Sequence, residues 1–170
     1  MTAYVSMACE LETERLVLRP WSVTDAEWYR QLLAERNVAA PELDKVRDFL
    51  AGAQERAAAS GIAALPVVRK QEGDPIGYCG LVVGRSTLAE PEIAYELFRH
   101  VHGSGYATEA ATAVLDAAIA TGRHRLWATV RGWNTASFRV LEKLRFERRH
   151  STWDDQGELV WNTRELPGSA

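Results

Sequence analysis

Hydrophobic residues recur along this chain at two spacings, and the spacings alternate from segment to segment. Steps of three and four residues predict helices at Thr24–Asn37, Pro41–Gly61 and Thr135–Leu144, and a long alanine-rich segment between Gly105 and Thr121 predicts a fourth. The first of these helices is expected to open with a capping box at Thr24–Glu27. In the second, proline occupies a favoured first position and glycine follows the last turn.

Shorter segments with alternating or continuous apolar residues predict strands between these helices. The predicted strands are 13–20, 62–69, 75–83, 92–98, 125–130, 146–151 and 159–163. The order β-α-α-β-β-β-α-β-α-β-β favours an α/β (α+β) fold, in which helices cover both faces of a mixed sheet of about seven strands. Strands 92–98 and 125–130 are expected to be parallel neighbours joined by a right-handed crossover helix.

Size and composition are those of one soluble domain. The 170 residues are 46% hydrophobic and 25% charged, and we expect a single domain with a core at about 11–165 and short tails at 1–8 and 167–170. The net charge of −3, with scattered basic residues, argues against nucleic acid as a partner. The hydrophobic pattern predicts neither a secretory signal nor a membrane span. The two cysteines, Cys9 and Cys79, are too few for a disulfide scaffold. A cytoplasmic location is expected.

The segment Glu92–Thr121 is the candidate for chemistry. It predicts a strand, a turn with Gly103 and Gly105, and a long alanine-rich helix. Unpaired amides at the helix start and the helix dipole together make an anion site, most often for phosphate. The turn lacks the Lys-Ser/Thr pair of a nucleoside-triphosphate loop and the third glycine of a dinucleotide fingerprint.

Four motifs in register make this pattern specific. The turn HGSGYATEA resembles the acyl-CoA-binding motif of the GCN5-related N-acetyltransferases, the GNAT superfamily. The segments TERLVLRPW from Thr13, IGYCGL at Ile76–Leu81 and NTASFRVLEKLRF at Asn134–Phe146 resemble the subfamily of ribosomal-protein N-terminal (RimJ/RimL-like) acetyltransferases. The resemblance implies the single-domain acyl-CoA N-acyltransferase fold, with a mostly antiparallel sheet splayed at its centre. It also implies acetyl-CoA as co-substrate.

The resemblance carries a set of cofactor residues onto this sequence. The family's pyrophosphate loop, Gln/Arg-x-x-Gly-x-Gly/Ala, aligns with His102–Ala107, so that His102 is a donor with pH-dependent charge. Asn134 matches an asparagine that binds pantetheine and also suits a helix N-cap. The cofactor-binding residues implied are Leu97, Phe98, Arg99, His102, Gly103, Ser104, Gly105, Tyr106, Ala107, Thr108, Asn134, Ser137 and Arg139.

The implied reaction is direct attack of a neutral amine on the thioester in a ternary complex. A lysine-type amine needs about 4.6 kcal/mol for deprotonation at neutral pH and an α-amine only about 1 kcal/mol, so a base is useful. Glu92 matches a catalytic glutamate of some family members, and Glu96, on the same strand face, is the reserve candidate. Ser137 matches a serine thought to assist the leaving thiolate. The tyrosine used elsewhere in the superfamily is replaced by Leu141.

The acceptor and the assembly stay open at this level. A protein N-terminus, an amino acid, a polyamine or an aminoglycoside-like molecule would each fit, and the protein could be a monomer or a homodimer. Aromatic residues near the expected acceptor groove could line it, or belong to the core or to a dimer interface; they are Trp28, Tyr29, Trp133, Trp153 and Trp161. Histidines and cysteines lack metal-ligand spacing, so no metal is expected. A catalytically idle acyl-CoA-binding module is the alternative function. Arg145 stands where the family usually has glycine.

Overall fold

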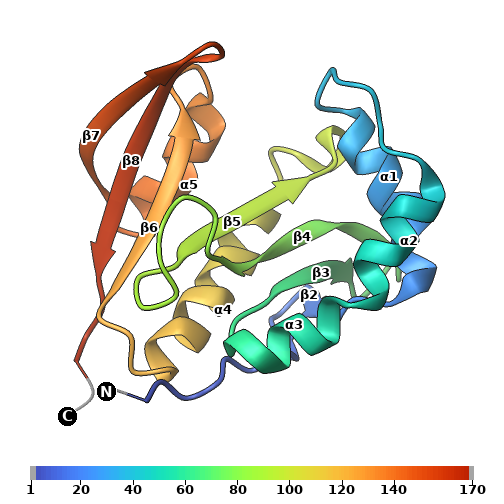
Figure 1. The fold of residues 1–170 in the computed structure, drawn as a ribbon, viewed down its shortest axis with the longest axis horizontal. Coiled ribbons are helices and arrows are strands. Elements are labelled where there is room, and N and C mark those ends of the chain that lie inside the picture. Colours follow the sequence, from blue (N-terminus) through green and yellow to red (C-terminus); the bar gives the residue numbers. More distant parts are fainter. Residues whose placement is uncertain (1–2, 169–170) are drawn as a thin grey trace.

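A single eight-stranded sheet runs through the computed structural model, which describes residues 3–168 (Figure 1). Positions 1, 2, 169 and 170, at the ends of the predicted tails, lie outside the described residues. The strands are β1 (Leu11–Glu12), β2 (Leu16–Leu18), β3 (Ala64–Arg69), β4 (Pro75–Val82), β5 (Glu92–Leu97), β6 (Arg125–Arg131), β7 (Glu147–Asp154) and β8 (Gly157–Glu165). Their order in the sheet is β1-β2-β3-β4-β5-β6-β8-β7. The α/β class is confirmed, with one strand more than expected.

The helices follow the predicted pattern with two corrections. They are α1 (Ala26–Ala34), α2 (Leu43–Ala51), α3 (Ala53–Ser60), α4 (Tyr106–Ala120) and α5 (Thr135–Lys143), with short 3-10 turns at Val23–Asp25 and Arg99–Val101. The predicted helix 41–61 is two helices, because Gly52 interrupts it, and it begins after Pro41. The predicted capping box at Thr24–Glu27 is wrong: Ser22 and Asp25 form the box two residues earlier.

Strands β5 and β6 are parallel, in contrast to the antiparallel pairs around them, and they touch at one point. Along the part of the chain that the structure describes, β5 and β6 pair only at Glu92 and Trp127, and the Trp127 amide donates to Pro91 O at 2.9 Å. Beyond that point the two strands diverge, while β5 stays paired with β4 along its whole length. The expected parallel neighbours are confirmed, and their divergence splays the sheet at its centre (Figure 1).

Helices cover both faces of the sheet around β4. Small side chains of α4, including Ala110, Ala111 and Val114, let this helix pack closely on one face with Cys79 of β4. On the opposite face, Tyr78 packs against a smaller cluster of α1 and α2 residues. Neighbouring residues of a strand point to opposite faces, so one strand supports both clusters. Within residues 3–168, no helix is long and apolar enough to cross a membrane.

Two local features differ from the sequence expectation. Residues 5–8 of the predicted tail are fixed: the Val5 amide donates to Thr121 O, and Met7 is buried in the core. Arg145 has a φ of +61°, the left-handed conformation that normally favours glycine. The amides of Arg145 and Phe146 donate to Glu142 and Leu141 carbonyls, which makes a Schellman end to α5.

Candidate functional site

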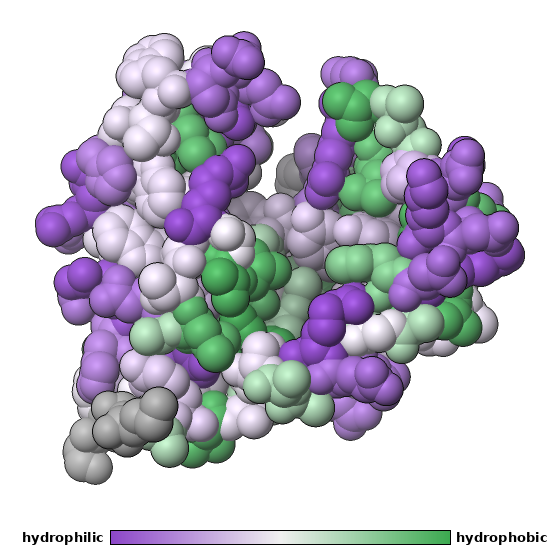
Figure 2. Space-filling model, in the orientation of Figure 1, coloured by the Kyte–Doolittle hydropathy of each residue, from purple (hydrophilic) through white to green (hydrophobic). Residues whose placement is uncertain are grey.

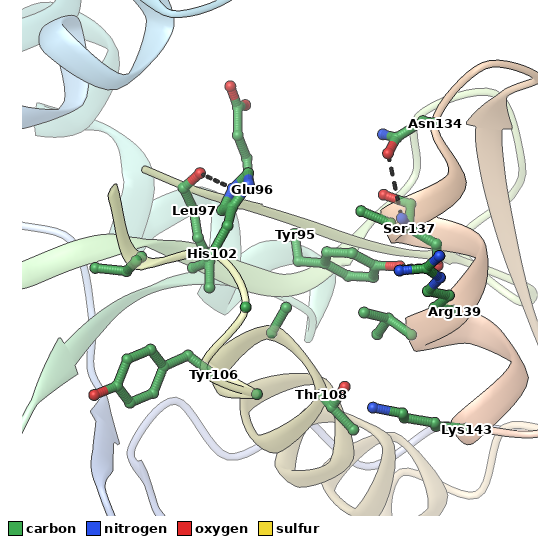
Figure 3. A pocket seen from close by; sticks show the side chains of 16 residues that line it. Tyr95, Glu96, Leu97, His102, Tyr106, Thr108, Asn134, Ser137, Arg139 and Lys143 are labelled. Atoms are coloured by element: carbon green, nitrogen blue, oxygen red, sulfur yellow. Dashed lines mark hydrogen bonds between the residues drawn. The ribbon is translucent and has the colours of Figure 1, made fainter. Parts of the chain in front are cut away.

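A cavity of about 450 Å³ opens where β5 and β6 diverge (Figure 3). We call it the central cavity. It is bounded by the end of β5, the loop before α4 with the first turn of that helix, and one face of α5. Its lining residues are Tyr95, Glu96, Leu97, Val101, His102, Gly103, Gly105, Tyr106, Ala107, Thr108, Asn134, Ala136, Ser137, Arg139, Val140 and Lys143. The divergence of two strands therefore creates the space in which segments far apart in sequence meet.

The loop His102–Gly105 turns the chain into α4. Gly103 and Gly105 have φ of +83° and +81°, a conformation in which side chains other than glycine are strained. Gly105 is the N-cap of α4, and among the described residues no side chain caps this end. The first amides of the helix, at Tyr106, Ala107 and Thr108, have no carbonyl one turn earlier to bond. They give the cavity a concentrated positive potential that suits an anion.

Arg15 and Glu109 hold this loop from behind. The Glu109 carboxylate accepts hydrogen bonds from Thr13 Oγ1 at 2.6 Å, Arg15 N at 2.8 Å and Arg15 Nε at 2.7 Å. The Arg15 guanidinium in turn donates to Ser104 O at 3.0 Å and lies 4.3 Å from the centre of the Tyr106 ring. Burial opposes ionisation of Glu109, but these hydrogen bonds outweigh burial and lower its pKa.

The free edge of β5 forms a second wall. The Phe98 amide donates to Ile76 O on β4, so residues of the opposite parity, Tyr95 and Leu97, direct their backbone groups toward the cavity. The Leu97 carbonyl accepts a hydrogen bond from His102 Nε2 at 2.9 Å (Figure 3). The Tyr95 amide and carbonyl and the Leu97 amide are left facing the gap.

Helix α5 forms the opposite wall. Asn134 caps it through its Oδ1 atom, which accepts from the Ser137 amide at 3.2 Å. The Tyr95 hydroxyl spans the gap and donates to the Ser137 carbonyl at 3.1 Å, and burial raises the pKa of that hydroxyl. In Figure 3, the Lys143 ammonium points across the cavity toward Thr108. Arg139 and Lys143 bring positive charge to the side that faces the open start of α4.

Most of the predicted cofactor residues meet at this cavity, and three do not. Phe98, Arg99 and Ser104 are absent from its lining. The Phe98 amide is used by β4, and the Arg99 amide donates to Glu35 Oε2 at 3.0 Å. Of the predicted 97–99 segment, Leu97 alone keeps a free amide, and the other free backbone groups of β5 belong to Tyr95, upstream of that segment.

The two candidate bases have different surroundings. Glu92 is 5% exposed, lies outside the cavity lining, and accepts hydrogen bonds from the Arg85 amide and from Thr129 Oγ1. Glu96 lines the cavity and points away from the glycine loop (Figure 3). Its carboxylate accepts from Arg36 Nε at 2.9 Å and from the Tyr78 hydroxyl at 3.2 Å. Glu96, the reserve candidate, is thus the carboxylate at the cavity.

A family model described as "Acetyltransferase (GNAT) domain" matches residues 15–147, which make up most of the chain. The chain belongs to the GNAT acetyltransferase family. The uncharacterized N-acetyltransferase p20 of Bacillus licheniformis is 26% identical over 146 residues, which is 81% of this chain and 82% of that protein.

Solved structures with a similar fold include two acetyltransferases. A GnaT-family acetyltransferase from Bordetella pertussis has a TM-score of 0.78 at 24% identity, covering 91% of this chain and 98% of its own. RimJ of Mycobacterium smegmatis, solved in complex with CoA-disulfide, has a TM-score of 0.70 at 23% identity, covering 88% and 81%. Both likenesses are likenesses of fold.

Several residues that line or adjoin the cavity were not predicted from the sequence. Helical spacing from Ala136 and Arg139 would have reached Val140 and Lys143, which lie on the same face of α5. Alternation along β5 would have shown that the Tyr95 side chain points to the other face of the strand from Glu96. Arg36 gave no signal in the sequence, because it reaches Glu96 from a loop 60 residues away.

The aromatic residues expected near the acceptor groove have different surroundings. Trp161 stacks on His150, with 5.3 Å between the ring centres. Trp28 and Tyr29 pack with Trp21 on the α1 face of the sheet, at ring distances of 5.3 Å and 4.8 Å from it. Trp133 and Trp153 are 75% and 74% exposed. Figure 2 shows a hollow between the α1–α2 side and the β6–β8 side, with hydrophilic side chains along its rim.

Proposed function

We propose that this GNAT protein transfers an acetyl group from acetyl-CoA to a primary amine in a ternary complex. One observation carries the proposal: the central cavity joins the free edge of β5 to the uncapped start of α4. A free strand edge suits the amides of pantetheine, which pair with it as an added strand. An open helix start suits the pyrophosphate. The complex of the similar RimJ with CoA-disulfide supports this choice of ligand.

The cavity residues divide along the cofactor. Tyr95 and Leu97 would pair with pantetheine through their backbone groups, joined by the side-chain amide of Asn134. The loop His102–Gly105 and the first amides of α4 would hold the pyrophosphate, with Arg139 and Lys143 adding charge from α5. His102 acts through its bond to the Leu97 carbonyl, which fixes the loop against the strand.

Bound acetyl-CoA supplies an acyl group that its thioester activates toward amines. Two protons leave the acceptor ammonium as its nitrogen bonds the acyl carbon and the carbon–sulfur bond breaks. We assign the first proton to the Glu96 carboxylate, which lies at the cavity, and not to the enclosed Glu92. The second proton reaches the sulfur, whose developing charge the Ser137 hydroxyl would stabilise as a hydrogen-bond donor.

One observation favours the alternative of an idle acyl-CoA-binding module. Leu141, which replaces the superfamily tyrosine, is 2% exposed and offers no proton to a thiolate. The module and the enzyme would bind the cofactor alike and differ in turnover.

Cofactor binding is tested first. Saturating acetyl-CoA should raise the melting temperature, whereas NAD and ATP should not, because the site lacks the signature residues for those ligands. Absence of a shift with acetyl-CoA would refute both the enzyme and the module.

Turnover separates these two functions. Thiol release from acetyl-CoA is followed with a peptide bearing a free N-terminus, an amino acid, spermidine and an aminoglycoside. We expect at least one amine to be acetylated, with kcat reduced about tenfold or more by Glu96→Gln. Ser137→Ala should lower kcat more than acetyl-CoA affinity. Thr135→Ala, which removes an exposed hydroxyl from the same helix turn, should change neither. Inactivity with every amine would favour the module.

A further inference from the structure

Arg36 forms an ion pair with the Glu96 carboxylate. Its guanidinium contacts both carboxylate oxygens, and Nη2 also donates to the Tyr78 hydroxyl at 3.2 Å. The Tyr78 hydroxyl is itself 3.2 Å from Glu96 Oε2. The three groups therefore form a closed hydrogen-bonded set at the acceptor side of the central cavity.

The surroundings of this set suit a cation that donates hydrogen bonds. The rings of Tyr29 and Tyr78 meet edge to face with 6.1 Å between their centres. Burial raises the pKa of Tyr78 and keeps its hydroxyl protonated. A carboxylate, a phenol oxygen and aromatic rings are groups that stabilise an ammonium as well as a guanidinium.

The loop that carries Arg36 does not depend on the ion pair for its position. Arg30 Nε donates to Pro41 O at 2.9 Å, which ties the loop between α1 and α2 back onto α1. Glu35 receives the Arg99 amide at 3.0 Å and so ties the loop to the end of β5. The Arg36 side chain can thus leave Glu96 without movement of the backbone.

The ion pair is also weak enough to exchange. The side chains of Arg36 and Glu96 are 46% and 23% exposed, so water screens their attraction and can solvate the released guanidinium. Exposed ion pairs of this kind contribute little free energy. Their loss corresponds to about a two- to fivefold change in the dissociation constant of a ligand that competes for the same carboxylate.

We infer that Arg36 holds the place of the acceptor's ammonium group, and that the acceptor binds as a cation by exchanging with Arg36 at Glu96 and Tyr78. The inference rests on the proposed function, since it names the charge state in which the amine enters. Arg36 is then a specificity-determining residue: it competes with the acceptor, and a neutral or anionic molecule offers Glu96 no positive charge to replace the guanidinium.

A binding experiment tests the exchange without turnover. The Nε–Hε NMR signal of Arg36, identified by its loss in Arg36→Gln, is followed in the CoA-bound protein as n-butylammonium is added. We expect this signal to move toward that of free arginine, and n-butanol at equal concentration to leave it in place. In Glu96→Gln the signal should already lie at the free position. A signal that n-butylammonium does not move would overturn the inference.

Kinetics with the best amine acceptor give a second, independent readout. Arg36→Gln should lower the acceptor KM about two- to fivefold with the acetyl-CoA KM unchanged. Arg36→Lys should lie between Arg36→Gln and wild type. Arg30→Gln is the matched control, because it loosens the same loop and leaves the ion pair intact. A raised acceptor KM in Arg36→Gln would mean that Arg36 binds the acceptor, and an unchanged KM that the ion pair is only structural.

The two proposals fail separately. If no amine is acetylated but n-butylammonium releases Arg36, the cation site stands and the transferase proposal falls. If amines are acetylated while both the NMR signal and the acceptor KM stay unchanged, the transferase stands and the exchange falls.

Discussion

Replacing Glu109 by glutamine tests whether the glycine loop is positioned from behind. The carboxylate receives Thr13 Oγ1, the Arg15 amide and the Arg15 guanidinium, and Arg15 in turn holds Ser104 O. Glutamine keeps the shape and one acceptor oxygen, but it presents an NH₂ group to the remaining donors. The change therefore removes the negative charge and one of the two acceptor oxygens, while α4 itself stays intact.

The expected loss of stability in Glu109→Gln depends on how exposed Arg15 and Glu109 are. Hydrogen bonds to a charged group contribute about 1.5–3 kcal/mol each when they are well buried. Here the Arg15 and Glu109 side chains are 42% and 19% exposed, so solvent screening reduces the share of the ion pair. We expect Glu109→Gln to lower the free energy of unfolding by about 1–2 kcal/mol at pH 7.

The pH dependence has a definite sign. Because the pKa of Glu109 is lowered in the folded state, its contribution is present above the unfolded value, about 4.3, and is lost as pH falls through the folded pKa. The difference between wild type and variant should therefore be full at pH 7 and shrink below about pH 4.

Urea denaturation at pH 7 and at a series of acid pH values measures this difference. Glu27→Gln is the matched control, because Glu27 also lies in the first turn of a helix but is exposed. It should change stability by less than about 0.5 kcal/mol. A Glu109→Gln effect as small as this, or one independent of pH, would refute the proposed support of the loop.

Four further changes follow from individual residues. Arg145→Gly should raise the free energy of unfolding by about 0.5–1 kcal/mol, since φ is +61° at this exposed position, and a lower urea midpoint would contradict this. Asp25→Asn should lower it by about 2–3 kcal/mol, because the buried carboxylate accepts four hydrogen bonds; a loss below about 1 kcal/mol would refute this. Glu92→Gln should lower it by about 1–2 kcal/mol and leave kcat near wild type, and a tenfold loss of kcat would return the role of base to this residue. A thiol reagent should modify Cys9 alone in the native protein, since Cys79 is fully enclosed and burial raises its pKa, and both thiols in denaturant.

Local pattern determined most of the secondary structure. The strands at 75–82, 92–97 and 125–131 and the helix at 135–143 lie within a residue or two of their predicted bounds. These segments have continuous apolar periodicity and clear turn residues at their ends, so neighbours in sequence decide their conformation. The errors fall where two signals compete, as at Ser22 and Thr24, which are both plausible caps, or where Gly52 interrupts a helix whose spacing continues across it.

At the site, the loop His102–Gly105 and its family could be predicted from the sequence, because a strand, two glycines and a helix form one contiguous motif. The sequence also placed Glu92 and Glu96 on one strand face. The folded structure was needed to show that Arg85 and Thr129 enclose Glu92 and that Glu96 lies at the cavity, paired with Arg36. Strand periodicity fixes the direction in which a side chain points, whereas its partners come from chain segments that meet it only through folding.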